Sequence, residues 1–199
     1  SIGYVLQEGG LFPHRSIADN IATVPRLEGA TKQASRERAL ELLTLVGLDR
    51  EMADRYPAQL SGGQRQRVGV ARALANRADI LLMDEPFGAL DPIVRAELQR
   101  ELKEIQRALG TTILFVTHDV DEAFTLGDQV AVLSTGGHIE QVGMPTELLS
   151  SPASPFVAEF VGASRAARPV RVAGPGGLVV DDAGTPVGTL TRDEAGERP

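Results

Sequence analysis

Two adjacent carboxylates follow a short apolar run near the middle of the chain. Residues 80–83 are apolar, and Asp84 and Glu85 come directly after them. A buried strand of a parallel sheet has this pattern, and open α/β sheets bind ligands at the carboxyl ends of such strands. Asp84 would suit a Mg²⁺ ion on a nucleotide, and Glu85 would suit a water that attacks the terminal phosphate. The alternative is a strand followed by an acidic turn without function.

Two other polar residues follow apolar runs and are expected at the same edge of the sheet. Gln7 comes after residues 2–6, and His118 comes after residues 111–117. Both runs predict strands, so both side chains would lie beside the two carboxylates. By itself, Gln7 could be an ordinary polar residue at a strand end, and a lone histidine is more often structural than catalytic.

A serine and two glycines open a helix that is predicted to run to about Asn76. Gly62 and Gly63 allow backbone N–H groups to approach a phosphate closely, and a helix N-terminus adds positive electrostatic potential. Ser61 is suited to be the N-cap, so an ordinary capped helix is the alternative interpretation. A cap alone, however, does not require two glycines followed by Gln64.

The remaining pattern predicts strands that alternate with helices, which implies right-handed crossovers, a largely parallel sheet and an α/β fold. Asp91 and Pro92 give a cap followed by proline at the first helical position, and Gly136-Gly137 predicts a hairpin turn. Helices are predicted over 16–24 (ended by Pro25), 35–46, 61–76, 91–109 and 119–126, with two short helices within 145–162 that turn Phe156, Phe160 and Val161 inward; strands are predicted over 2–7, 80–85, 111–117, 129–134 and 138–142.

Composition excludes several classes of function. The net charge of −7 gives no electrostatic basis for binding nucleic acid. The absence of cysteine excludes disulfides and thiolate metal sites and fits the cytosol. No uncharged apolar run approaches the roughly 20 residues that a membrane helix needs, so membrane association would require a partner. The chain opens without Met in an apolar run, and we expect this N-terminus to be a cut within a strand of a domain.

Four motifs in a fixed order resemble the nucleotide-binding subunit of ATP-binding cassette (ABC) transporters. They are Leu60-Ser61-Gly62-Gly63-Gln64, Asp84-Glu85-Pro86, Ala89-Leu90-Asp91 and Thr117-His118. The resemblance covers about residues 1–162 and implies a P-loop NTPase (RecA-like) parallel sheet with the ABC helical subdomain. It divides the region into 8–76 (Q-loop and helical subdomain), 77–143 (RecA-like part) and 144–162 (C-terminal helices). Beyond it we expect a linker over 163–177 and a short tail over 178–199, which resembles a fragment of a CBS module.

The resemblance implies a role for each residue at the predicted edge of the sheet. Glu85 matches the catalytic carboxylate that orients or deprotonates the attacking water, and Asp84 matches the residue that supports Mg²⁺. His118 matches the switch histidine that contacts the γ-phosphate of ATP. Gln7 matches the Q-loop glutamine, which senses the metal and the water and links the site to the membrane subunits.

The resemblance also implies a homodimer with two composite ATP sites. Ser61, Gly62, Gly63 and Gln64 match the signature motif, which faces the ATP held by the opposite subunit. Asp91 caps its helix and also matches the D-loop aspartate at the dimer interface. The implied cofactors are therefore ATP and Mg²⁺, and a second copy of the chain completes each site.

One motif of the family is missing. The phosphate-binding loop G-x-x-x-x-G-K-[ST] occurs nowhere in the 199 residues, and residues 29–32 have neither its spacing nor a strand before them. The aromatic residue that stacks on adenine is likewise not identifiable. We therefore expect a fold that lacks the N-terminal strands and the P-loop, and a chain that by itself binds ATP poorly and barely hydrolyses it.

Three segments are similar to the osmoprotectant importers of this family: 9–14, 20–25 and 67–74. Such a protein would hydrolyse ATP to power import of glycine betaine, carnitine, choline or a related quaternary amine. It would sit at the cytoplasmic face of the membrane, held by permease subunits, with a substrate-binding protein as an indirect partner. The alternatives are an importer ATPase for polyamines, sulfonates or amino acids, a soluble cassette ATPase of DNA repair or translation, and a catalytically inactive truncated fragment.

Overall fold

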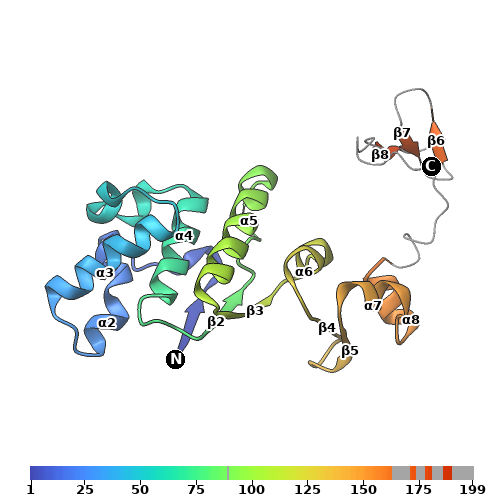
Figure 1. The fold of residues 1–199 in the computed structure, drawn as a ribbon, viewed down its shortest axis with the longest axis horizontal. Coiled ribbons are helices and arrows are strands. Elements are labelled where there is room, and N and C mark those ends of the chain that lie inside the picture. Colours follow the sequence, from blue (N-terminus) through green and yellow to red (C-terminus); the bar gives the residue numbers. More distant parts are fainter. Residues whose placement is uncertain (89, 163–170, 174–177, 181–185, 190–199) are drawn as a thin grey trace, which may run out of the picture. The chain divides into compact units, whose positions relative to one another are not determined.

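The structure is a computed structural model that describes residues 1–88, 90–162, 171–173, 178–180 and 186–189 (Figure 1). The chain forms two compact units, Ser1–Glu122 and Ala123–Pro199. The predicted domain boundaries after residues 162 and 177 remain predictions. Ala89, most of the predicted linker (163–170 and 174–177) and the end of the predicted tail (190–199) lie outside the described residues.

The first unit contains a three-stranded parallel sheet in the order β1–β2–β3. The strands are β1 (Ile2–Val5), β2 (Ile80–Asp84) and β3 (Thr112–Val116), and β2 pairs with both neighbours, so that Leu81 lies beside Gly3 and Ile113. All three strands were predicted, and the α/β fold with a parallel sheet is confirmed. Because the strands are parallel, the residues that follow them all lie at one edge.

Between these strands in the sequence, the described residues form five α-helices. They are α1 (Ile17–Ile21), α2 (Thr23–Leu27), α3 (Lys32–Leu45), α4 (Gly62–Ala73) and α5 (Pro92–Leu109), with short 3₁₀ helices η1 (Gln7–Gly9), η2 (Arg50–Asp54) and η3 (Pro57–Gln59). Helix α4 contacts β1, α1, α3 and α5, so it is the central helix of the unit (Figure 1). Its Val68 and Ala71 are fully buried, as are Leu43 of α3 and Ile17 of α1.

The two faces of the sheet differ in exposure. Val5, Leu81 and Met83 are buried, because the helices cover their face. On the opposite face, Leu114 and Val116 are each 63% exposed. The buried strand expected at residues 80–83 is therefore only partly correct among the described residues, because Leu81 and Met83 are buried whereas Ile80 is 38% exposed.

Local capping explains where several helices begin and end. The prediction that Pro25 ends a helix is wrong, because Pro25 is the third residue of α2. The first backbone N–H groups of a helix have no partner within it, so proline is tolerated there. Helix α3 begins earlier than predicted, because the Thr31 side chain caps it by accepting a hydrogen bond from the Ala34 N–H (3.2 Å). Gly110 adopts the left-handed conformation that ends α5, as predicted.

The second unit begins within α6 (Val120–Leu126) and contains the predicted hairpin of β4 (Val130–Leu133) and β5 (Ile139–Gly143). Gly136 and Gly137 have φ values of 85° and 76°, so the turn needs glycine at both positions. The two short helices are α7 (Pro145–Ser150) and α8 (Pro155–Phe160). Among the described residues, no helix has the length and apolar character to span a membrane.

The predicted inward face of α8 is only partly correct. Val161 is 7% exposed and Val157 is fully buried, whereas Phe156 and Phe160 are 43% and 46% exposed. The two phenyl rings stack on each other, with centroids 5.9 Å apart. The apolar residues of α8 and its C-cap Val161 thus form two pairs at i, i+4 spacing, and the valine pair rather than the phenylalanine pair is buried.

A small antiparallel sheet follows in the order β6–β7–β8, formed by β6 (Arg171–Ala173), β7 (Leu178–Val180) and β8 (Pro186–Thr189). Strands β7 and β8 lie in the predicted tail, whereas β6 lies inside the predicted linker, where no strand was expected. The segment around β6 is rich in Gly and Pro, which predicts a linker. A strand of three residues depends on pairing with another strand, here β7, and has no clear signal in its own sequence.

Candidate active site

Three of the predicted residues meet at the carboxyl edge of the parallel sheet. Gln7 opens η1 after β1, Glu85 follows β2, and His118 follows β3. The Gln7 Nε2 donates a hydrogen bond to the Glu85 Oε2 (3.5 Å), and the His118 Nδ1 lies 3.1 Å from the Glu85 Oε1. The carboxylate of Glu85 is therefore held from both sides by groups that lie far from it in the sequence.

The backbone of Glu85 has an unusual conformation. Its φ of 41° lies in the left-handed region, which non-glycine residues seldom adopt. The Glu85 N–H donates to the Val116 carbonyl of β3 (3.0 Å), and the Gly88 N–H donates to the Glu85 carbonyl (3.2 Å). These bonds hold the sharp turn at the end of β2, and such strained residues cluster at functional sites.

His118 is 74% exposed in its side chain, and Glu85 is 34% exposed. When Glu85 is ionised, the His118 Nδ1 carries the proton that is donated to it. The Nε2 atom of the exposed ring is then an acceptor in the neutral ring and a donor in the imidazolium form. In the imidazolium form, the arrangement suits a ligand with negatively charged oxygens that approaches the edge of the sheet.

Asp84 ends β2 beside Val116 and is exposed. Among the described residues, no group of three or more His, Asp or Glu side chains is arranged to hold a metal ion. Mg²⁺ on a nucleotide needs only one or two carboxylates, because phosphates and waters supply its other ligands. Asp84 therefore fits such an ion. Gln7, the other predicted ligand, has an amide whose oxygen and nitrogen can exchange places by rotation.

The signature residues form the start of α4. The Ser61 side chain accepts a hydrogen bond from the Gln64 N–H (3.2 Å), and the Gln64 side chain accepts one from the Ser61 N–H (2.9 Å). This capping box confirms the predicted N-cap and explains Gln64 structurally. A Cβ atom on Gly63 would lie 2.8 Å from the Val94 Cγ1. The close packing of α4 against α5 therefore also requires glycine at position 63, in addition to the phosphate approach that the sequence suggested. Sequence reasoning missed this packing requirement.

The Ser61→Ala substitution is expected to lower the free energy of unfolding by about 1 kcal/mol, because one N–H of the first turn of α4 loses its acceptor. Urea unfolding followed by circular dichroism measures this change. Thr44→Ala is the matched control, since the Thr44 hydroxyl donates only to the Leu40 carbonyl inside α3. Equal stability of the Ser61→Ala and Thr44→Ala proteins would contradict the structural importance of the cap.

Asp91 caps α5, as predicted. Its Oδ1 accepts hydrogen bonds from the N–H groups of Ile93 and Val94, both at 3.1 Å. Among the described residues, no hydrogen bond or ion pair joins Asp91 or the signature residues 61–64 to the cluster of Gln7, Glu85 and His118. The structure therefore brings together one part of the predicted site and leaves the signature and the D-loop aspartate outside it.

Sequence reasoning missed a clamp on the loop that follows Gln7. Arg72, near the end of α4, donates to the carbonyls of Gly10 (2.8 Å) and Gly9 (2.9 Å). Burial lowers the pKa of Arg72, although a guanidinium stays protonated at any ordinary pH. A Cβ atom on Gly69 would lie 2.9 Å from the Gly9 Cα. Helix α4 thus carries the signature at one end and holds the Gln7 loop near the other.

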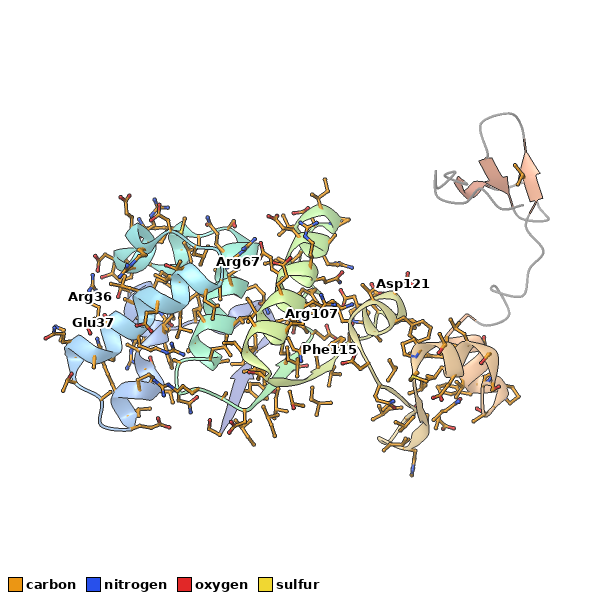
Figure 2. The ribbon with its side chains drawn as sticks, in the orientation of Figure 1. Arg36, Glu37, Arg67, Arg107, Phe115 and Asp121 are labelled. Carbon is orange, nitrogen blue, oxygen red and sulfur yellow. The ribbon has the colours of Figure 1, made fainter. Side chains whose placement is uncertain are left out.

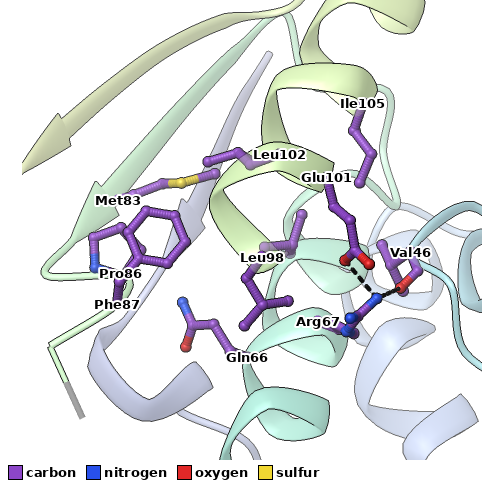
Figure 3. Close-up of a pocket in the computed structure, with 11 residues that line it drawn as sticks. Val46, Gln66, Arg67, Met83, Pro86, Phe87, Leu98, Glu101, Leu102 and Ile105 are labelled. Carbon is purple, nitrogen blue, oxygen red and sulfur yellow. Dashed lines mark hydrogen bonds and ion pairs between the residues drawn. The ribbon is translucent and has the colours of Figure 1, made fainter. Parts of the chain in front are cut away.

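A second contact region joins α4 to α5. Arg67 of α4 pairs with Glu101 of α5, lies 3.7 Å from the Glu97 carboxylate and donates to the Val46 carbonyl (3.1 Å) (Figure 2, Figure 3). Beside it lies a mostly apolar cavity of about 20 Å³, which is room for one water molecule. The buried Gln66 lines it with an unpaired Nε2 (Figure 3). None of the predicted site residues lines this cavity.

Comparison with known proteins supports the resemblance. A family model described as "ABC transporter" matches residues 1–88. The glycine betaine/carnitine/choline transport ATP-binding protein of Bacillus subtilis is 56% identical over 164 residues, which are 82% of this chain and 43% of that protein. The glycine betaine uptake system ATP-binding protein of Escherichia coli is 53% identical over 82% of this chain and 53% of its own length. The chain thus spans about half the length of these relatives.

A solved structure shares the fold. It is a dimeric ATP-binding cassette in a post-hydrolysis state with ADP and Pi bound, and it is 36% identical. The TM-score is 0.61, with 72% of this chain and 62% of that chain covered. The motif order, the parallel sheet and the sequence matches agree with one another. The chain therefore belongs to the ABC transporter family, with sequence similarity to the ATP-binding proteins of osmoprotectant importers.

Proposed function

We propose that the chain is part of an ATP-hydrolysing subunit that powers import of a quaternary-amine osmoprotectant such as glycine betaine, carnitine or choline. The observation that carries the ATPase proposal is the convergence of Gln7 and His118 on the Glu85 carboxylate. The names of the relatives support the class of solute, because they are ATP-binding proteins of glycine betaine, carnitine and choline transport.

In the proposed reaction, Glu85 orients the attacking water and accepts its proton. His118, as an imidazolium, donates through Nδ1 to Glu85 and through Nε2 on the opposite side of its exposed ring to the γ-phosphate. The amide of Gln7 stabilises the same carboxylate. Asp84 and Gln7 are the residues that would hold Mg²⁺, which when bound offsets the negative charge of the phosphates. The edge of the sheet then supplies the groups that act on the water and on the terminal phosphate.

The signature residues act in this proposal on the ATP of a second copy. Ser61 begins a helix whose free N–H groups and positive end suit a phosphate, but it has no contact with the Glu85 cluster. A two-fold dimer would resolve this separation, since each copy would give its helix start to the other copy's ATP. Asp91 would lie at that interface. Permease subunits would hold the dimer at the cytoplasmic face, and a substrate-binding protein would be an indirect partner.

A second candidate is a non-catalytic fragment that retains the docking surfaces without turnover. The observation that favours it is the absence of the pattern G-x-x-x-x-G-K-[ST] from the 199 residues. Without that loop, few groups remain to bind the β- and γ-phosphates. The two candidates differ in a single measurement, which is ATP turnover once a phosphate-binding segment precedes Ser1.

A complementation experiment tests the class of solute. Residues of the 56% identical Bacillus subtilis protein that precede its matched region are joined ahead of Ser1, and the chimera is expressed in a strain that lacks that protein. Uptake of labelled glycine betaine at high salt is expected to return to at least a tenth of the level given by the intact relative. A chimera that hydrolyses ATP but restores no uptake would contradict the proposed transport role.

A further inference from the structure

Arg95, in the first turn of α5, contacts three groups from two separate segments. Its Nη2 donates to the Leu90 carbonyl (3.2 Å), which lies directly before Asp91. Its Nη1 lies 3.3 Å from the Asp119 Oδ2, and its Nε lies 3.6 Å from the Glu122 Oε1. The guanidinium therefore joins the start of α5 to the residues that follow β3.

Asp119 and Glu122, which Arg95 contacts, belong to the turn that contains His118. The Thr117 hydroxyl accepts from the Asp119 N–H (3.0 Å) and donates to the Glu122 Oε2 (2.7 Å). The Asp119 Oδ1 accepts from the N–H groups of Asp121 (2.9 Å) and Glu122 (3.2 Å), which caps α6. Apart from the contact between His118 and Glu85, these hydrogen bonds of the turn all involve Thr117 or the carboxylates of Asp119 and Glu122, which Arg95 contacts.

Charge and burial make Arg95 necessary to this turn. The Glu122 side chain is only 5% exposed, and a buried carboxylate must be paired and hydrogen-bonded. The Thr117 hydroxyl gives one hydrogen bond, and Arg95 gives the positive charge. The guanidinium donates through Nη1 to Asp119 and through Nη2 to the Leu90 carbonyl, and its charge faces Glu122, although Nε forms no hydrogen bond. An ammonium group lacks this planar fork and cannot reach all three groups.

We propose that Arg95 is a positioning residue that holds His118 against Glu85 and ties its turn to the segment that leads into Asp91. The proposal rests on the proposed function, in which His118 acts at the γ-phosphate and Asp91 at the dimer interface. In this arrangement, Arg95 at the start of α5 fixes the position of the turn that contains His118. Neither Gln7 nor the signature takes part in the network.

Nuclear magnetic resonance on the 199-residue chain tests the proposal with Arg95→Gln and Arg95→Lys. The amides of Asp119, Asp121 and Glu122 are expected to exchange with solvent about tenfold faster in Arg95→Gln. The acceptor of the last two is the Asp119 carboxylate, and the acceptor of the first is the Thr117 hydroxyl, which the Glu122 carboxylate holds; both carboxylates lose the cation that orders them. The ring ¹⁵N resonances of His118 are expected to shift as its bond to Glu85 loosens. Arg95→Lys keeps the charge and is expected to restore part of both signals.

The control is Arg36→Gln at a residue of α3 that is labelled in Figure 2. The Arg36 Nη2 donates to both carboxylate oxygens of Asp54 (2.9 Å each), and Arg36 takes no part in the network. It is expected to leave the His118 signals unchanged. Unchanged exchange after residue 118 in Arg95→Gln, or faster exchange of equal size throughout α3 and α4, would overturn the proposal. Both readouts are independent of ATP turnover, so failure of the proposed ATPase activity is recognised separately.

Discussion

ATP turnover is expected to fall by about 10²- to 10⁴-fold when Glu85 is replaced by glutamine in a chimera with a phosphate-binding segment ahead of Ser1. Glutamine keeps the size of the side chain but cannot accept the proton of the attacking water. The hydrogen bonds at Glu85 show that its carboxylate is held in place by Gln7 and His118. The apparent KM for ATP is expected to change little, because the substitution removes a group that acts on the water.

Phosphate release under saturating Mg-ATP measures the effect. Glu37→Gln is the matched control, because Glu37 is an exposed residue of α3 whose carboxylate accepts a hydrogen bond only from Gln33 (Figure 2). Turnover within threefold of the unsubstituted chimera in Glu85→Gln would contradict the role of Glu85. For the 199-residue chain alone we expect almost no turnover, and measurable turnover that Glu85→Gln abolishes would contradict that expectation.

The Gly3→Ala substitution is expected to destabilise the first unit by about 1–3 kcal/mol. A Cβ atom on Gly3 would lie 2.3 Å from the Ala73 carbonyl oxygen and 2.9 Å from the Ala73 carbonyl carbon, at the end of α4. Both contacts are with backbone atoms, so no side-chain rotation relieves them. Strand β1 and helix α4 must therefore separate, which also displaces Gln7 at the end of β1.

Urea unfolding gives the change in stability, and Gly62→Ala is the matched control. A Cβ atom on Gly62 would meet two side-chain atoms at ordinary distances, the Leu90 Cδ2 at 3.5 Å and the Arg65 Nη2 at 3.9 Å. Because alanine favours a helix more than glycine does, this control is expected to be neutral or slightly stabilising. Equal midpoints for the two proteins would show that β1 is not packed against α4 in the way described.

Features that depend on neighbouring residues could be predicted from the sequence. Ser61 caps α4, Asp91 caps α5 and Gly110 ends α5, because each is a local hydrogen bond or a local backbone conformation. The parallel strands were also predictable, since an apolar run between helices has few alternatives. Where a second local signal competed, prediction failed: Pro25 was read as a stop, although the start of a new helix accepts it.

Features that depend on packing were beyond a single sequence. At α8, Val157 and Val161 are buried and Phe156 and Phe160 are exposed. Helical spacing is compatible with burial of either pair, so the sequence pattern could not decide between them. Arg72 and Arg95 read as ordinary charged positions on helices. Only the fold brings Arg72 to the carbonyls of Gly9 and Gly10 and Arg95 to the turn of His118.

The sequence by itself determined the family, the candidate residues and the edge of the sheet at which they would lie. Motif order and the apolar pattern of the strands are local properties of the sequence, so they can be recognised without the fold. Only the tertiary structure decided which of the candidate residues meet. Gln7, Glu85 and His118 come together because β2 pairs between β1 and β3, whereas residues 61–64 remain apart at the start of α4. Strand order and helix packing arise from contacts between distant segments, and the burial of Leu81, Val68 and Leu43 rather than any local signal sets them.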